Sequence, residues 1–141
     1  MFDYEVFFIR NYDGDTISLS IDLGFDTFRE ITVRLLGVNT SEIRGGTTDT
    51  KILAKAAKQY VFDVLSNAEY IRVKTIKDST DKYGRYLAEI IYTPDKISKE
   101  TLVKIRQNPF EELLKTRSLA DFKDLSNELL NKCAGTVLYK P

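Results

Sequence analysis

Five charged side chains fall in loops or at the ends of predicted strands: Asp13, Asp15, Arg34, Glu42 and Arg85. Carboxylates grouped with a backbone carbonyl are oxygen ligands for a hard cation, and two guanidinium groups can bind a phosphate through planar, permanently charged forks. A cation together with arginines suits phosphoester chemistry, because preorganised positive charge stabilises the negative charge that develops on the phosphorus oxygens. In that reaction Glu42 would orient or deprotonate the attacking water.

Each of these signals also has an ordinary structural interpretation. Asp-Gly-Asp at 13–15 is more often a turn, and an arginine on a strand is more often a surface charge or a member of a salt-bridge cluster. The chemistry therefore depends on whether the fold brings the five side chains together at one end of a barrel.

Composition limits which other chemistry is available. The 141 residues, 43% hydrophobic and 30% charged, are typical of one globular domain. The 21 basic and 21 acidic residues balance, so an anionic polymer must be bound by a local cluster. The absence of histidine excludes imidazole bases, histidine-dependent triads and nearly all mixed zinc sites. The single cysteine, Cys133, cannot form an internal disulfide and is expected to be a small buried residue near a helix end.

Alternating apolar residues predict strands over 4–10, 16–22, 28–36, 70–76 and 86–92. Asp13-Gly14 predicts a tight turn with left-handed backbone, so that the first two strands pair antiparallel. Apolar residues at spacings of three and four predict a helix over 49–68, between the third and fourth strands. This order predicts an α+β fold, a five-stranded OB-fold β-barrel whose face and loops commonly bind oligonucleotides or oligosaccharides.

Beyond Pro94 the pattern becomes helical. Asn108 and Pro109 predict the cap and the first residue of one helix, and Ser118 with Asp121 predicts a second cap. A final helix packed on the barrel is predicted by five apolar residues, Leu119, Phe122, Leu125, Leu129 and Leu130. We expect a single domain over 1–141, with a barrel core at 4–93, a helical insertion at about 94–123 and a C-terminal helix and tail at 124–141.

Three blocks of the sequence resemble the signature blocks of the staphylococcal nuclease (thermonuclease) family in order and spacing. They are Asp-Gly-Asp-Thr at 13–16, Val-Arg-Leu-Leu-Gly-Val-Asn-Thr-Ser-Glu-Ile-Arg-Gly at 33–45 and Asp-Lys-Tyr-Gly-Arg at 81–85. The resemblance covers residues 4 to about 92 and resumes at 125–141. It implies an OB-fold barrel and a Ca²⁺-dependent phosphodiesterase, a nuclease that acts on DNA and RNA and cuts the 5′ P–O bond to leave 3′-phosphate ends.

Carried over by position, the resemblance implies that Asp15 is a direct Ca²⁺ ligand and that Thr40 is a ligand through its backbone carbonyl. Asp13 would hold a calcium-bound water. Where the family has a second aspartate ligand this chain has Asn39, whose amide oxygen can still coordinate Ca²⁺. Because the site loses one formal negative charge, we expect weaker calcium binding.

The same resemblance implies that Arg34 and Arg85 bind the scissile phosphate and stabilise its transition state, with Glu42 as the general base or water-orienting group. It also implies nucleotide contacts by three further residues, Lys82 and Tyr83 at a terminal phosphate and Tyr139 at a base.

Two other positions depart from the family pattern. Ser41 replaces a usual proline, which leaves that loop less rigid, and Val137 stands where a nucleotide-facing tyrosine is common. Some domains of the family have lost their catalytic residues, so the retention of Arg34, Glu42 and Arg85 favours an enzyme here. The alternatives are a catalytically weak or inactive OB-fold that binds nucleic acid, and an interaction domain in a larger assembly.

The expected partner is DNA, RNA or both, and the chain is expected to be a monomer. The sequence has no signal-like N-terminus and no run of 18 apolar residues, so we expect no membrane association and a cytoplasmic or phage-encoded intracellular nuclease. The segment 94–123 is interpreted as a packed helical cap, with a surface for a protein partner as the alternative.

Overall fold

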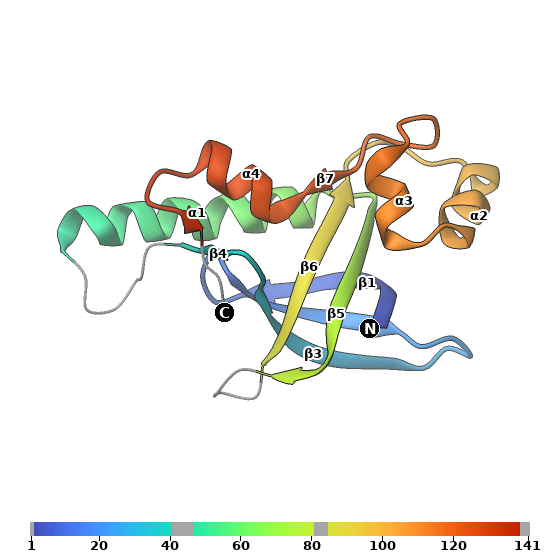
Figure 1. Ribbon diagram of the computed structural model, residues 1–141, viewed down its shortest axis with the longest axis horizontal. Coiled ribbons are helices and arrows are strands. Elements are labelled where there is room, and N and C mark those ends of the chain that lie inside the picture. The colour runs from blue at the N-terminus through green and yellow to red at the C-terminus, as the bar shows by residue number, and fades with distance from the viewer. Residues whose placement is uncertain (1, 41–46, 81–84, 139–141) are drawn as a thin grey trace.

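The computed structural model describes residues 2–40, 47–80 and 85–138, and its long strands close into a barrel (Figure 1). The barrel strands are β1 (Phe2–Asn11), β2 (Thr16–Asp22), β3 (Phe28–Leu35), β5 (Tyr70–Thr80) and β6 (Tyr86–Thr93). Antiparallel pairing runs in the order β3-β2-β1-β5-β6, and a parallel pairing of β3 with β6 joins the two edges. The predicted α+β class and five-stranded OB-fold barrel are confirmed.

The alternation of β2 and β3 fixes which side chains face the barrel interior. Ile17 and Leu19 are fully buried and lie opposite Val33 and Ile31 of β3. Because successive side chains of a strand point to opposite faces, the neighbouring positions lie on the other face. Thr16 and Arg34 are register partners there, at the start of β2 and the end of β3.

The closure of the barrel brings a distant part of the chain to the same end. In the parallel pairing, Arg34 of β3 lies opposite Leu87 of β6. Arg85 immediately precedes β6. Residues some fifty positions apart in the sequence therefore come together beside Thr16.

Helix α1 (Thr48–Ser66) lies between β3 and β5 in chain order, as predicted, and covers the barrel next to β1. The Thr47 side chain caps its first turn by accepting a hydrogen bond from the Thr50 N–H at 3.2 Å. The stripe that faces the core consists of four buried residues, Ala54, Ala57, Val61 and Leu65. The helix thus forms where the apolar spacing predicts it.

Two very short strands lie outside the barrel sheet. β4 (Val38–Asn39) pairs antiparallel with β8 (Val137–Leu138), so that Asn39 lies opposite Val137. The pairing places a segment close to the C-terminus beside the end of β3.

The C-terminal third contains α2 (Lys99–Gln107), α3 (Phe110–Lys115), β7 (Lys123–Asp124) and α4 (Leu125–Lys132). Helix α4 packs on the main core through Leu125 and Leu129, whereas α2 and α3 cover a second apolar cluster around Phe110 and Ile105. In Figure 1 α4 lies near β4, and α2 and α3 lie at the opposite end of the molecule.

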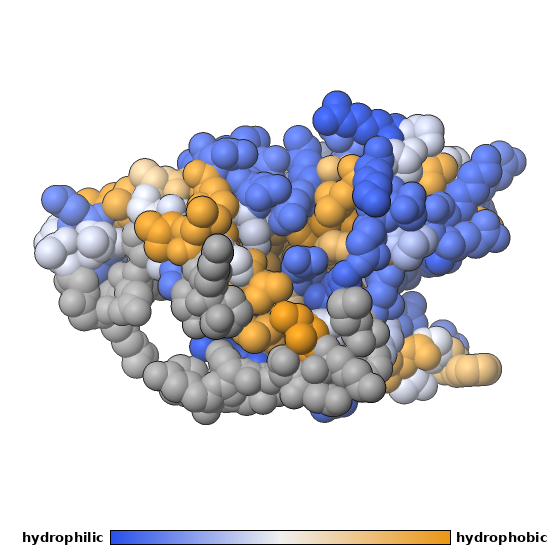
Figure 2. Space-filling model, viewed as in Figure 1, coloured by the Kyte–Doolittle hydropathy of each residue, from blue (hydrophilic) through white to orange (hydrophobic). Residues whose placement is uncertain are grey.

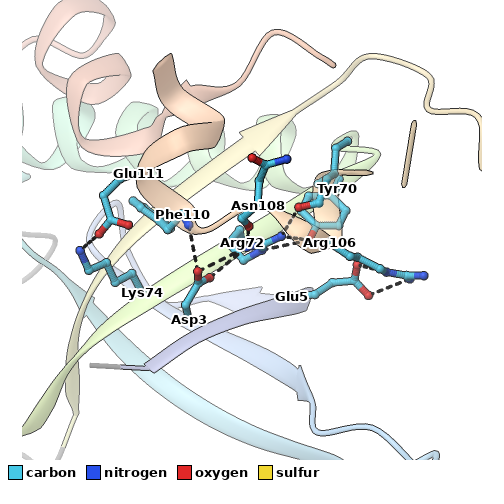
Figure 3. A network of polar contacts seen from close by, with 10 residues as sticks. Asp3, Glu5, Tyr70, Arg72, Lys74, Arg106, Asn108, Phe110 and Glu111 are labelled. Atoms are coloured by element: carbon cyan, nitrogen blue, oxygen red, sulfur yellow. Dashed lines mark hydrogen bonds and ion pairs between the residues drawn. The ribbon is translucent and has the colours of Figure 1, made fainter. Parts of the chain in front are cut away.

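A buried arginine attaches α2 and α3 to the barrel (Figure 3). Arg72 of β5 forms an ion pair with Asp3 of β1 at 3.2 Å and donates through Nη2 to the Tyr70 hydroxyl at 2.7 Å. It also donates to the backbone carbonyls of Ile105 at 3.0 Å and Asn108 at 2.9 Å. The two carbonyl contacts join β5 to the C-terminal end of α2, and the ion pair joins β5 to β1.

The predicted capping residues of the C-terminal helices are partly wrong. Asn108 ends α2, and Pro109 is the N-cap of α3 instead of its first helical residue. Ser118 caps no helix, because its hydroxyl is hydrogen-bonded to Thr116 Oγ1 at 2.8 Å. The last helix begins only at Leu125.

Tertiary packing explains the late start of α4. Phe122, predicted to lie in the final helix, packs in the second apolar cluster, edge-to-face with Tyr70 at 5.9 Å between ring centroids. The chain continues from there into β7, and Asp124 caps α4 by accepting from the Ser126 N–H at 3.0 Å. Cys133, at the C-cap of α4, is half-buried against the core, and burial raises the pKa of its thiol.

Apolar side chains are also exposed, most clearly at the tip of the β2–β3 hairpin (Figure 2). Phe25 is fully exposed there in a left-handed conformation with φ of 54°. Among the described residues, no helix combines the length and apolar character that crossing a bilayer requires.

Candidate active site

The turn between β1 and β2 is organised by the Asp13 carboxylate. Its Oδ1 accepts the backbone N–H groups of Asp15 at 2.9 Å and of Thr16 at 2.7 Å. The Asn11 side chain donates to the Asp13 carbonyl at 3.0 Å and to the Lys58 carbonyl of α1 at 2.9 Å. Burial, and then the nearby Asp15, raise the pKa of Asp13 despite these two backbone donors. Asp13 therefore shapes the turn that presents Asp15.

Gly14 is required in this turn for space. Its φ is not positive, so the predicted left-handed backbone is wrong. A Cβ at Gly14 would lie 2.6 Å from Thr40 Cγ2 and 3.0 Å from the Ala57 Cβ of α1. The missing side chain lets Thr40 approach the turn closely.

The buried Asp15 carboxylate joins three parts of the site. Its Oδ2 accepts from the Thr40 N–H at 3.0 Å and lies 3.2 Å from the Thr40 hydroxyl. The same oxygen is 3.5 Å from Arg34 Nη2. Asp15 Oδ1 accepts a hydrogen bond from the Thr16 hydroxyl at 3.3 Å.

Arg34 is only 8% exposed, and protein oxygens surround its guanidinium group. Nη1 donates to the carbonyls of Leu35 at 2.7 Å and Val38 at 2.8 Å. Nη2 donates to Asn39 Oδ1 in addition to its ion pair with Asp15. Arg34 therefore holds the end of β3 and the start of β4 in place as well as facing Asp15.

Arg85 reaches the same cluster through Thr16. Its Nη1 donates to Thr16 Oγ1 at 2.9 Å, and that hydroxyl donates to Asp15. The two arginines are thus linked through one hydroxyl and one carboxylate. Arg34, Arg85 and Asp15 are three of the five charged side chains on whose convergence the predicted chemistry depends.

The structure brings together six of the ten predicted site residues: Asp13, Asp15, Arg34, Asn39, Thr40 and Arg85. The other four, Glu42, Lys82, Tyr83 and Tyr139, lie outside the described residues. Their roles stay predictions.

Two residues of the site were not predicted from the sequence. Thr16 bridges Asp15 and Arg85, and Asn11 anchors the turn to α1. Thr16 follows Asp15 directly in the first motif block, which is a signal that could have identified it. Asn11 has no such signal, because its partner Lys58 is distant in sequence.

The family model described as Staphylococcal nuclease homologue matches residues 32–106, which is more than half of the chain. The chain belongs to this family. No curated protein matches the sequence. The match includes Arg34, Asn39, Thr40 and Arg85, so four of the six clustered residues lie inside the matched region of this staphylococcal nuclease homologue.

Calcium is the cation that membership of the staphylococcal nuclease family suggests, and the donor atoms fit it in kind. Asp15 Oδ2 and Asn39 Oδ1 are hard oxygen donors of the kind that Ca²⁺ prefers, and both contact Arg34 Nη2. Among the described residues, no three carboxylate, cysteine or histidine side chains gather in a metal-binding group. The described donors therefore supply the oxygen chemistry of a calcium site with little negative charge.

Two guanidinium groups, an adjacent carboxylate and polar loop oxygens can bind an anion and a cation side by side. The arginines supply permanent positive charge, which suits a phosphate. Asp15 supplies the compensating negative charge on which a cation would depend.

Proposed function

We propose that this staphylococcal nuclease homologue is a Ca²⁺-dependent nuclease that hydrolyses phosphodiester bonds of DNA, RNA or both. One observation carries the proposal: Arg34 and Arg85, far apart in the sequence, converge on Asp15 at one end of the barrel. Two permanently charged guanidinium groups close to one acid suit the binding of a phosphate.

The arginines perform the electrostatic part of the reaction. A phosphodiester bound between Arg34 and Arg85 gains negative charge on its nonbridging oxygens as water attacks. Fixed guanidinium groups stabilise that charge without reorganising, because Arg34 is already held by the carbonyls of Leu35 and Val38. The preorganised arginines therefore lower the barrier more than they strengthen ground-state binding.

Calcium would be held by Asp15, by the Asn39 amide oxygen and by the backbone carbonyl of Thr40. When bound, it supplies positive charge that offsets the phosphate and favours ionisation of a coordinated water. Asp13 keeps the turn in the conformation that presents Asp15 to this position.

Glu42 is assigned the role of orienting or deprotonating the attacking water. Lys82 and Tyr83 are assigned to a terminal phosphate, and Tyr139 to a base. These four assignments rest on the family motif positions of the sequence.

One observation favours a second function, a nucleic-acid-binding module with little or no activity. Arg34 Nη2 already contacts Asp15 and Asn39, and Asn39 replaces a charged ligand by a neutral one. A phosphate must compete with these contacts for the same guanidinium nitrogen. In this alternative the barrel binds the polymer, and the cluster of Arg34, Arg85 and Asp15 only stabilises the fold.

Cleavage of single-stranded DNA and RNA with millimolar Ca²⁺, with and without chelator, tests the proposal. We expect chelator-sensitive cleavage that falls about hundredfold or more in Arg85→Lys, because lysine keeps the charge but loses the planar fork. Glu42→Gln should show a loss of similar size.

Arg29→Lys is the matched control, since Arg29 is an exposed arginine at the other end of β3. It should cleave at the wild-type rate. Binding without cleavage by the wild-type protein would favour the binding module, and equal loss in Arg29→Lys and Arg85→Lys would contradict the proposed site.

A further inference from the structure

Helix α1 has strongly segregated charges on its surface. Its basic residues are Lys51, Lys55 and Lys58, at spacings of four and three, so they form one row along a single flank of the helix. Its acidic residues, Asp49 and Asp63, lie on another face of the helix, where the Gln59 amide donates to Asp63 at 2.8 Å. The lysine row is therefore not neutralised by its own helix.

All three lysines are exposed, and within the described ranges none of their ammonium groups forms an ion pair. Lys74 and Lys132 of other elements pair with acids. The exposed Lys96, Lys99 and Lys104 form no ion pair with the described residues, but they do not lie beside the candidate active site. Exposed cations without partners on a chain of zero net charge favour binding of a polyanion.

The C-terminal end of the row, at Lys58, lies beside the candidate active site. The Lys58 carbonyl accepts from Asn11, which also holds Asp13, and the neighbouring Ala57 packs against Gly14. The turn that presents Asp15 therefore contacts α1 at this end of the lysine row.

At this same end, one turn beyond Lys58, the row continues into an aromatic residue. Phe62 follows Lys58 by four positions on the same flank, is 48% exposed and packs edge-to-face on Phe8 at 5.9 Å between centroids. From Lys51 to Phe62 the helix rises about 16 Å, which is the length of several nucleotides rather than of one phosphate.

Phe62 also lines a groove of about 550 Å³ between β1, α1 and α2. The groove is mainly apolar and includes Phe7, which is 52% exposed. Its two acids are Glu5, which is paired with Arg106 at 3.0 Å, and Glu69. The groove therefore suits an uncharged ring more than a phosphate.

We propose that the lysine row and Phe62 bind the strand that flanks the scissile phosphate, with Lys51, Lys55 and Lys58 on the phosphates and a base stacked at Phe62. The occupant is a single-stranded polynucleotide, because only unpaired bases expose their faces for stacking. This inference rests on the proposed nuclease function and names the substrate class as a single strand of several nucleotides.

Fluorescence anisotropy with a labelled 20-residue oligothymidylate, in chelator and over a range of salt concentrations, tests the lysine row. For single strands each phosphate contact contributes about 0.7 to the slope of log affinity against log salt, so Lys51→Gln/Lys55→Gln/Lys58→Gln should flatten the slope by about 2. At 0.1 M salt the affinity should fall on the order of tenfold or more.

The control is Lys96→Gln/Lys99→Gln/Lys104→Gln, which removes three exposed lysines from α2 and the segment before it. It should bind with the wild-type slope. If both triple variants lose the same slope, or neither loses any, the proposal is overturned.

Phe62→Ser tests the stacking contact with two probes. We expect weaker binding of the oligothymidylate and unchanged binding of an abasic oligomer of the same length, which has the phosphates but no bases. Equal losses for the two probes would overturn a stacking role. Thermal unfolding of Phe62→Ser identifies any loss that comes from the Phe8 contact.

Cleavage of a dinucleotide diester by the wild-type protein separates this inference from the proposed function. If the wild-type protein cleaves the dinucleotide but the lysine variants bind oligothymidylate as the wild type does, the inference is overturned and the nuclease proposal stands. Lysine-dependent binding without any cleavage supports the inference and overturns the nuclease proposal. Binding of an RNA oligomer of the same length shows whether the lysine row distinguishes RNA from DNA.

Discussion

Arg34 and Arg72 are both buried arginines, and within the described residues each contacts one carboxylate and two backbone carbonyls. Arg34 lies beside β4 and Arg72 lies under α2 and α3. Burial and an ion pair therefore do not distinguish a candidate catalytic arginine from a structural one in this protein.

The difference lies in what the partners connect. Arg72 and its partner Asp3 join the barrel to the helical segment, and Asp3 also accepts the Phe110 N–H at 2.9 Å. Arg34 contacts Val38 and Asn39 just after its own strand and Asp15 in the turn before β2, and there a second arginine, Arg85, joins the cluster through Thr16. The pairing of two guanidinium groups around one acid is the feature that points to phosphate chemistry.

The largest effect is expected at Arg72. Arg72→Ala leaves Asp3 and two helix carbonyls without their buried donor, and should lower the free energy of unfolding by about 3–5 kcal/mol. Arg106→Ala, which breaks the exposed pair with Glu5, should cost at most about 1 kcal/mol. Urea unfolding measures both, and equal losses would show that Arg72 has no special structural role.

At the site, Gly14→Ala should destabilise the protein by about 1–3 kcal/mol, because its Cβ would overlap Thr40 Cγ2. It should also reduce cleavage by displacing Thr40 from Asp15. Adding Thr40→Ser removes that methyl group and should restore part of the stability. Full stability of Gly14→Ala alone would contradict the packing argument.

Asn39→Asp tests whether position 39 of the candidate site binds a metal ion. A second carboxylate beside Asp15 raises the negative charge of the donor set, so calcium affinity should rise about tenfold in calorimetric titration. Unchanged affinity would remove position 39 from the metal site.

The smallest effect is expected where α4 joins α1. Burial raises the pKa of Glu128, but hydrogen bonds from Lys132 and Tyr60 outweigh it and the net shift is downward. A carboxylate whose folded pKa is lowered stabilises the fold above its unfolded value, and this stability is lost as the pH falls through the folded pKa.

Wild-type protein should therefore lose more stability below about pH 5 than Glu128→Gln does, with a difference of about 0.3–0.5 kcal/mol for the partly exposed pair with Lys132. Urea unfolding at pH 7 and pH 3 measures it. A larger loss in the glutamine variant would contradict the sign of the shift.

Much of the barrel follows from local pattern. The alternation of Ile17, Leu19 and Ile21 predicts β2, and the spacing of Ala57, Val61 and Leu65 predicts α1. Each pattern marks the face that the strand or helix buries in the core, so it can be recognised within that one segment of sequence. The turn at Gly14 was predicted in the right place for the wrong reason, since the requirement for glycine comes from Thr40 and Ala57. The start of α4 was misplaced because Phe122 packs with Tyr70, a contact that local capping signals do not report.

The amino-acid sequence by itself determined the strands, the long helix, the exclusion of histidine chemistry and the motif residues that indicate the nuclease family. Only the tertiary structure decided that Arg85 reaches Thr16, that Asn39 contacts Arg34 and that Val137 pairs beside them. The physical reason is distance along the chain. Periodicity and capping act within a few residues, whereas barrel closure and two-residue strands depend on partners that no local pattern specifies.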